Sequence, residues 1–255
     1  MKENFDDLFC GSTDVYPTNT QFQPKSISWS SADLIGQFQK NDIVLDSKTI
    51  AEMKEGLWND LCSEYDAENF CNYLKGSGVK LSNDFKSFEY VWRRDEFNHY
   101  LGFKQIYSLL YDVTEDDIVK EMKRRPVNFE PIKPMLQDEF KICLLIAYDE
   151  IATTKNYASE YEFYTSFGPA NFLRWVKNVT RDEAYHFNNC MELIGKNFKN
   201  RINEIPKLVD RFIDWDLNGE EYHGTFVLDH DGPYFTSEVL NTCGDTIKNY
   251  FDRKR

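Results

Sequence analysis

Two Glu-x-x-His tetrads constrain the fold of this chain more than any other feature. They span Glu96 to His99 and Glu183 to His186, and both fall in segments with helical periodicity. Positions i and i+3 lie on one face of a helix, so each tetrad directs a carboxylate and an imidazole to the same point. This pair of ligand types suits a redox-active first-row metal such as iron. The pattern therefore predicts two helix faces that meet around metal ions.

The periodicity predicts an all-α protein built on four long helices, because no strand pattern of any length competes with the helical one. We expect these helices over residues 47–74, 82–112, 136–164 and 170–200. A short helix over 114–125, ended by Pro126, should occupy a long crossover between helices 2 and 3. We expect additional C-terminal helices over 205–217 and after Pro233. Residues 1–45 should form an N-terminal arm, and residues 46–255 the bundle domain.

Two single glutamates complete the expected ligand set. Glu64 lies 32 residues before Glu96, and Glu150 lies 33 residues before Glu183. Each half of the chain is therefore predicted to be a helical hairpin with a lone Glu opposite a tetrad. Glu68 lies on the same stripe as Glu64 and is the alternative ligand. A carboxylate buried among apolar residues is costly unless it is paired or binds a metal, and four carboxylates with two imidazoles suffice for two ions.

A third tetrad, Glu220 to His223, lies between two glycines, where a helix is not expected, so we interpret it as a coincidence in a loop. The net charge of −13 argues against nucleic acid and anionic membranes as partners. No apolar run is long enough to span a bilayer, and the N-terminus does not resemble a signal peptide. The six cysteines are scattered, which predicts buried thiols in a reducing cytoplasm: Cys10, Cys62, Cys71, Cys143, Cys190 and Cys243.

Three stretches resemble the soluble acyl-acyl carrier protein desaturases, a ferritin-like di-iron family. Residues Trp92 to His99 resemble the family pattern W-x-x-E-E-x-x-H, residues 150–153 match E-x-A-T, and residues 182–186 match D-E-x-x-H. A weaker similarity follows over residues 226–232. The likeness covers roughly residues 64–232 and implies a ferritin-like four-helix bundle. Its E-x-A-T and D-E-x-x-H elements are more specific to di-iron oxidases than to desaturation.

The resemblance also implies roles for individual residues. The iron ligands would be Glu96, His99, Glu150, Glu183 and His186, with Glu64 or Glu68. Thr153 would place a hydroxyl beside the oxygen-binding face, unless it bonds back to its own helix. Asp182 and Trp92 would support the ligands from outside, with Asp182 holding an imidazole, although Trp92 could simply be core packing. Asp95 replaces a family Glu and is expected to face away from the site.

By the same resemblance, the chain is expected to oxidise a fatty-acyl or similar apolar chain, as a desaturase. It would use two Fe ions (an Mn/Fe pair fits the same ligands), O2, an external donor such as a ferredoxin-like protein, and an acyl carrier protein or small-molecule substrate. A homodimer is expected, with the basic residues 120–125 as a possible dock or simply as a helix end.

Two other functions are compatible with this sequence. The nearer is a di-iron monooxygenase that hydroxylates C–H bonds or oxygenates an amine, which the short chain favours. The other is iron storage in a cage, which the additional C-terminal helix and Thr153 argue against. A purely structural bundle would need buried Lys or Arg partners for its carboxylates. Four apolar residues near the ligands are expected to line or support a substrate pocket: Phe103, Ile106, Phe140 and Phe187.

Overall fold

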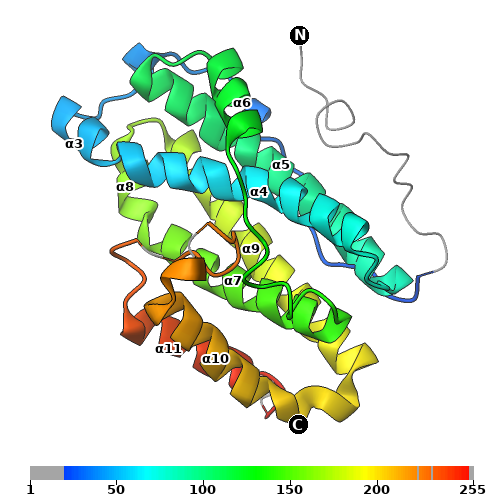
Figure 1. Ribbon diagram of the computed structural model, residues 1–255. Helices are drawn as coiled ribbons and strands as arrows, with labels where there is room; N and C mark the ends of the chain where they lie inside the picture. The colour runs from blue at the N-terminus through cyan, green and yellow to red at the C-terminus, as the bar shows by residue number, and fades with distance from the viewer. Residues whose placement is uncertain (1–19, 223, 231, 253–255) are drawn as a thin grey trace.

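The computed structural model describes residues 20–222, 224–230 and 232–252, and this part of the chain is all-α, without strands. Figure 1 shows the long helices lying side by side, with the C-terminal helices packed on one flank. The long helices are α4 (Lys54–Ser77), α5 (Asn83–Tyr111), α7 (Glu139–Ser159) and α9 (Ala170–Asn197). The shorter elements are α2 (Ser31–Ile35), η1 (Lys40–Asp42), α3 (Ser47–Glu52), α6 (Glu115–Arg124), α8 (Tyr161–Ser166), η2 (Lys199–Glu204), α10 (Ile205–Asn218), η3 (Glu220–Tyr222) and α11 (Ser237–Lys248).

The long helices form two antiparallel hairpins, α4 with α5 and α7 with α9. Between them, the segment with α6 returns along the bundle, so that α5 and α7 run in the same direction (Figure 1). The segment between the second and third long helices is therefore a long connection that passes along the bundle. Its start is local: the Thr114 hydroxyl accepts a hydrogen bond from the Asp117 amide and caps α6.

Two predicted helices are each broken in the structure. The first divides at Met53 into α3 and α4. No residue of α3 is buried, so packing does not hold it in line with α4. The third begins at Glu139, where the Asp138 carboxylate caps the helix, and it divides at Glu160 into α7 and α8.

The apolar core consists of two clusters, one toward each end of the long helices. One joins α7, the second half of α9 and the C-terminal helices to the loop end of the first hairpin. The other joins the opposite ends of α4, α5 and α9 to α8. The predicted metal-binding residues lie near the boundary between the two clusters, so a polar layer crosses the middle of the bundle.

The segment before α3 crosses the α5 and α9 surface over its described residues. Residues 1–19 of the expected N-terminal arm lie outside the described part. The Ser31 amide donates to Asn98 Oδ1 at 2.8 Å, and the Ser31 hydroxyl accepts from Trp175 Nε1 at 2.8 Å. Since Asn98 lies on α5 and Trp175 on α9, Ser31 links the two helices. This segment therefore closes one side of the polar layer.

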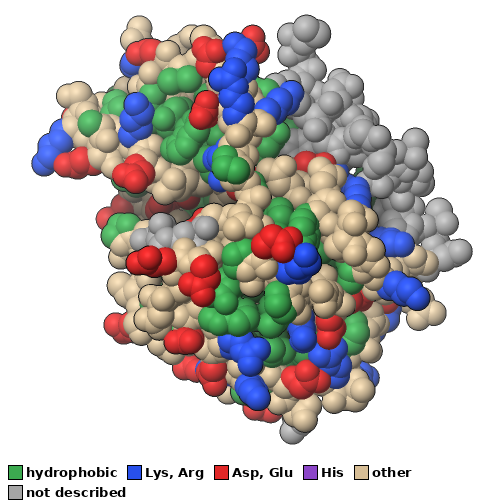
Figure 2. Space-filling model, in the orientation of Figure 1, with side chains coloured by type: hydrophobic (Ala, Val, Ile, Leu, Met, Phe, Trp, Pro, Cys, Tyr) green, Lys and Arg blue, Asp and Glu red, His purple; other side chains and the backbone are tan. Residues whose placement is uncertain are grey.

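The surface mixes charges of both signs, and Figure 2 shows acidic and basic side chains interspersed with small apolar areas on one face. No helix in the described ranges combines the length and the apolar character that crossing a bilayer requires. The five described cysteines are all buried free thiols, as predicted, whereas Cys10 lies outside the described residues.

Candidate metal centre

All six predicted ligands meet in the polar layer, one from each of α4 and α7 and two from each of α5 and α9. They form two overlapping groups in which one ligand atom per residue lies within 4.8 Å of the others. Glu64 and His99 belong to one group, and Glu150 and His186 to the other. Glu96 and Glu183 belong to both groups. In dinuclear sites of helical bundles, two carboxylates bridge the ions and the other ligands each bind one ion. The two groups described here have the same arrangement.

The two imidazoles present the same nitrogen to the carboxylates. His99 Nδ1 lies 3.2 Å from Glu64 Oε2 and 3.2 Å from Glu183 Oε1. His186 Nδ1 lies 3.2 Å from Glu150 Oε2 and 3.0 Å from Glu183 Oε2. Both imidazoles are fully buried. A neutral imidazole with its proton on Nε2 would direct the Nδ1 lone pair at the centre of each group.

Each Nε2 atom faces an aspartate from the other tetrad helix. His99 Nε2 lies 3.2 Å from Asp182 Oδ2, as predicted for Asp182. His186 Nε2 lies 3.4 Å from Asp95 Oδ2, so the expectation that Asp95 faces away from the site was wrong. Such carboxylate partners fix the orientation and tautomer of a metal-binding histidine. The repeated Asp-Glu-x-x-His pattern could have revealed the second pair.

Trp29 is a further residue of this network that the sequence reasoning missed. Its Nε1 donates to Asp182 Oδ2 at 2.6 Å, and its ring lies over His99 at a centroid distance of 5.9 Å. Trp29 is half-buried, so the hydrogen bonds from Trp29 through Asp182 connect the protein surface to His99. Because Trp29 belongs to a segment with weak periodicity, nothing in the sequence indicated its position.

The structure separates the two candidate glutamates of α4. Glu68 is turned to Arg93, whose Nη2 lies 2.6 Å from Glu68 Oε2. Glu64 points into the centre and accepts a hydrogen bond from the Tyr157 hydroxyl at 2.6 Å. Glu64 therefore joins the ligand groups, while Glu68 is already paired with a buried cation.

The charge of the centre suits divalent cations. Burial, together with the charges of Glu183 and Glu64, raises the pKa of Glu96, and burial also raises the pKa of Glu150. Burial disfavours the charged imidazole of His99, but the charges of Glu64 and Glu183 outweigh it and raise the pKa of His99. In the absence of ions, protons would have to offset these charges. Two divalent cations would neutralise four ionised glutamates, so the donor set fits a dinuclear site.

The space beside the ligands is small. A cavity of about 10 Å³ is lined by seven polar residues and Phe226, which corresponds to about one water molecule. Phe226 has a φ of 75°, a left-handed conformation that is rare for a bulky residue and costs energy. Thr153 lines the cavity, and none of the four expected pocket residues does. Phe226 lies in the predicted similarity after the bundle, but its place beside the ligands was not foreseen.

The other predicted supporting residues lie as follows. Among the described residues, the Thr153 hydroxyl forms no hydrogen bond; it is the neighbouring Thr154 hydroxyl that bonds back to the Glu150 carbonyl at 2.7 Å. Trp92 is 1% exposed and stacks on Phe88, with a centroid distance of 5.9 Å, and its indole N–H has no partner in the described part of the chain. These contacts place Trp92 in the apolar core.

A second buried polar network lies behind the cavity and includes the cavity residue Asp149. His230 Nδ1 lies 2.7 Å from Asp216 Oδ2, and its Nε2 lies 3.4 Å from Asp149 Oδ1. The Tyr148 hydroxyl donates to Asp216 at 2.8 Å. Burial opposes the charge of His230, but Asp216 and, to a smaller extent, Asp149 outweigh it and raise the pKa of His230 to about 10. The network fastens the segment after α10 to α7.

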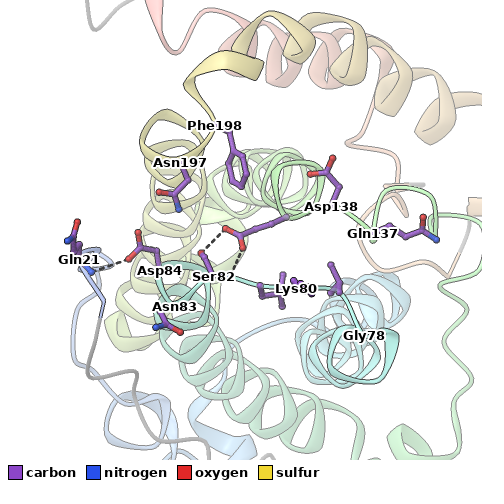
Figure 3. A pocket seen from close by; sticks show the side chains of 13 residues that line it. Gln21, Gly78, Lys80, Ser82, Asn83, Asp84, Gln137, Asp138, Asn197 and Phe198 are labelled. Atoms are coloured by element: carbon purple, nitrogen blue, oxygen red, sulfur yellow. Dashed lines mark hydrogen bonds between the residues drawn. The ribbon is translucent and has the colours of Figure 1, made fainter.

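A larger groove of about 1040 Å³ lies at the loop end of the first hairpin (Figure 3). Its carboxylates are already satisfied by the protein. Glu139 accepts from the Ser82 hydroxyl at 2.8 Å, and Asp84 accepts from the Gln21 amide at 3.1 Å. The groove is thus a junction between helix ends.

The remaining sequence features are peripheral. In the third tetrad, residues 220–222 form the short helix η3, and His223 lies outside the described residues. The basic residues 120–125 do end α6, and Arg125 at that end pairs with Asp66. Comparison of the chain with protein-family models, curated proteins and solved structures finds no match.

Proposed function

We propose that this protein is an O2-dependent di-iron oxidoreductase with a ferritin-like bundle. The observation that carries the proposal is the pair of overlapping ligand groups that share Glu96 and Glu183. Glu64 and His99 would hold one ion, Glu150 and His186 the other. When bound, a reduced iron pair would supply part of the electrons that reduce O2, and the substrate would supply the rest as it is oxidised. An Mn/Fe pair is a second possible loading of the same ligands.

The chain's own residues would orient the ligands and exclude water. Asp182 and Asp95 would hold the imidazoles in the tautomer that leaves Nδ1 free. The free Thr153 hydroxyl at the cavity could donate a hydrogen bond to a molecule placed there. Trp29, connected to His99 through Asp182, offers the external electron donor a route from the surface.

The cavity size bears on the substrate. Its volume of about 10 Å³ is too small for an acyl chain in this conformation, and its polar lining does not suit an apolar substrate. A desaturase would need the segment around Phe226 to move. A monooxygenase that acts on a small molecule at the cavity would need a smaller movement of this segment. We therefore favour the monooxygenase alternative, with a small molecule as its substrate.

The first test is metal content after anaerobic loading with Fe²⁺, followed by O2 uptake. We expect close to two ions per chain in the wild type and a loss of at least one ion in Glu64→Gln. The matched control is Glu68→Gln, one turn further along α4. This variant should keep both ions, because Glu68 forms an ion pair with Arg93 and is not among the proposed ligands. Folded wild-type protein without bound iron would refute the proposal. Size-exclusion chromatography separates a small oligomer from a storage cage.

A further inference from the structure

A second acidic pair lies next to the metal centre, between α4 and the end of α7. These helices run in opposite directions, and they meet where Tyr157 bonds to Glu64 (Figure 1). One turn earlier on α4 is Asp60, and three residues after Tyr157 is Glu160. Antiparallel directions place Asp60 and Glu160 on the same side of the Glu64–Tyr157 contact. The charge of Glu160 acts on Asp60 more strongly than that of Glu64, which supports this placement.

The two carboxylates are half-buried. Within the described residues, neither side chain forms a hydrogen bond or an ion pair, and Glu160 Oε2 is buried without a partner. Burial, and then the charge of Glu160, raises the pKa of Asp60, while burial raises the pKa of Glu160 to about 7. Two acids near each other without a counter-charge are unfavourable unless a proton or a cation joins them.

The Tyr164 hydroxyl gives an independent indication of a ligand. Tyr164 is 0% exposed, and its hydroxyl has no hydrogen-bond partner in the described part of the chain. The Tyr164 amide donates to the Glu160 carbonyl at 3.0 Å, so the two side chains lie one helical turn apart on the same face. Burial raises the pKa of Tyr164, and the next largest causes are the charges of Glu160 and Asp60, which is consistent with this placement. A buried hydroxyl without a partner is rare in native proteins and points to a water or an ion that completes its hydrogen bonding or coordination.

The pair also lies on the solvent side of the metal centre. Glu64 is 2% exposed, whereas Asp60 and Glu160 retain partial exposure. Figure 2 shows acidic side chains in a recess between the first half of α4 and the C-terminal segment. A cation arriving from solvent on this side would meet Asp60 and Glu160 before Glu64.

We propose that Asp60, Glu160 and Tyr164 form a transient binding site for a hydrated divalent cation, from which ions pass to Glu64 and the metal centre. Carboxylate and hydroxyl oxygens suit Fe²⁺ or Mn²⁺ that keeps part of its water shell. Glu64 would receive the ion, since it lies one turn from Asp60 on the same helix face. This inference rests on the proposed dinuclear site.

The test follows the loading of apoprotein with Mn²⁺ by the loss of the free-ion EPR signal after rapid mixing. Asp60→Asn and Glu160→Gln should slow loading by about tenfold, because they remove the charges that attract the ion. The number of ions bound at equilibrium should remain that of the wild type. Glu162→Gln is the matched control, since Glu162 is a neighbouring exposed carboxylate and should load at the wild-type rate.

Tyr164→Phe keeps the aromatic packing, so it provides a second test of the site if a carboxylate variant fails to fold. It should slow loading less than the carboxylate changes do. If the wild type binds two ions and both carboxylate variants load at its rate, the pair merely shares a proton and this inference alone is overturned. If the wild type binds neither Mn²⁺ nor Fe²⁺, the proposed function falls as well. Equal slowing by Glu162→Gln would show general surface attraction instead of a site, and would also overturn the inference.

Discussion

Replacing Asp182 by asparagine tests whether the aspartates orient the two imidazoles of the proposed metal centre. Asp182 is fully buried and accepts hydrogen bonds from both Trp29 and His99 through one oxygen, Oδ2. An amide of the same shape can keep one oxygen at the Oδ2 position, and its NH2 group would then replace Oδ1, which has no hydrogen-bond partner in the described part of the chain. The amide is neutral, however, so it removes the negative charge that favours a proton on His99 Nε2. If the imidazole responds by moving its proton, Nδ1 can no longer offer a lone pair to a metal.

Loss of such an outer carboxylate lowers metal affinity by about 10–100-fold, which corresponds to about 1.4–2.7 kcal/mol. We expect this loss for Asp182→Asn at the ion held by His99, with little change at the other ion. The assay is competition for Co²⁺ against a chromophoric chelator under anaerobic conditions. Because the two ions share Glu96 and Glu183, the data should be fitted with two coupled sites.

Two comparisons sharpen the result. Asp95→Asn should weaken the ion held by His186 instead, since Asp95 occupies the mirror position. Trp29→Phe removes one donor and leaves the Asp182 carboxylate to His99, so its effect should be smaller than that of Asp182→Asn. Wild-type affinity for both ions in Asp182→Asn, with the fold intact, would refute the orienting role.

Two further predictions concern stability. Asp216 raises the pKa of His230 to about 10 against the opposing effect of burial, so this pair stabilises the fold below the unfolded pKa of about 6.5 and loses its effect as the pH rises through about 10. In urea unfolding, the free energy of unfolding of the wild type should therefore fall between about pH 7 and pH 10, by up to about 1.4 kcal/mol per pH unit. The free energy of His230→Gln should depend less on pH. Parallel pH dependences of the two proteins would contradict this. In the helices, a Cβ on Gly102 would lie 2.4 Å from the Trp175 ring, whereas one on Gly56 would meet no atom within 4 Å. Gly102→Ala should cost about 1–3 kcal/mol and Gly56→Ala should gain about 0.5–1 kcal/mol, and equal thermal shifts would be inconsistent with this packing.

Features that depend on local chemistry could be predicted from the sequence. Capping residues such as Ser82 and Thr114 mark helix starts because their hydroxyls satisfy nearby backbone amides. The six predicted ligands meet because the same spacing recurs in the two hairpins. The choice between Glu64 and Glu68 could not be made, since it depends on the partner that Arg93 takes across the hairpin.

Features that depend on contacts between distant segments were missed. Asp95 reaches His186 only because α5 and α9 pack together, and the sequence of α5 alone does not show which neighbour it faces. Trp29 and Phe226 belong to irregular segments, where no periodicity assigns a face. The breaks at Met53 and Glu160 also escaped notice, because neither position has a glycine or proline to mark it.

The crossed aspartate–histidine pairs have a consequence for assembly. His99 on the first hairpin is oriented by Asp182 on the second, and His186 on the second is oriented by Asp95 on the first. During synthesis, the first hairpin emerges with half of the ligands and no partner for its imidazole. Neither half can therefore present a finished half-site to a passing ion. If the polar layer binds metal as proposed, capture would be deferred until both hairpins have docked, and an incomplete chain would not trap iron.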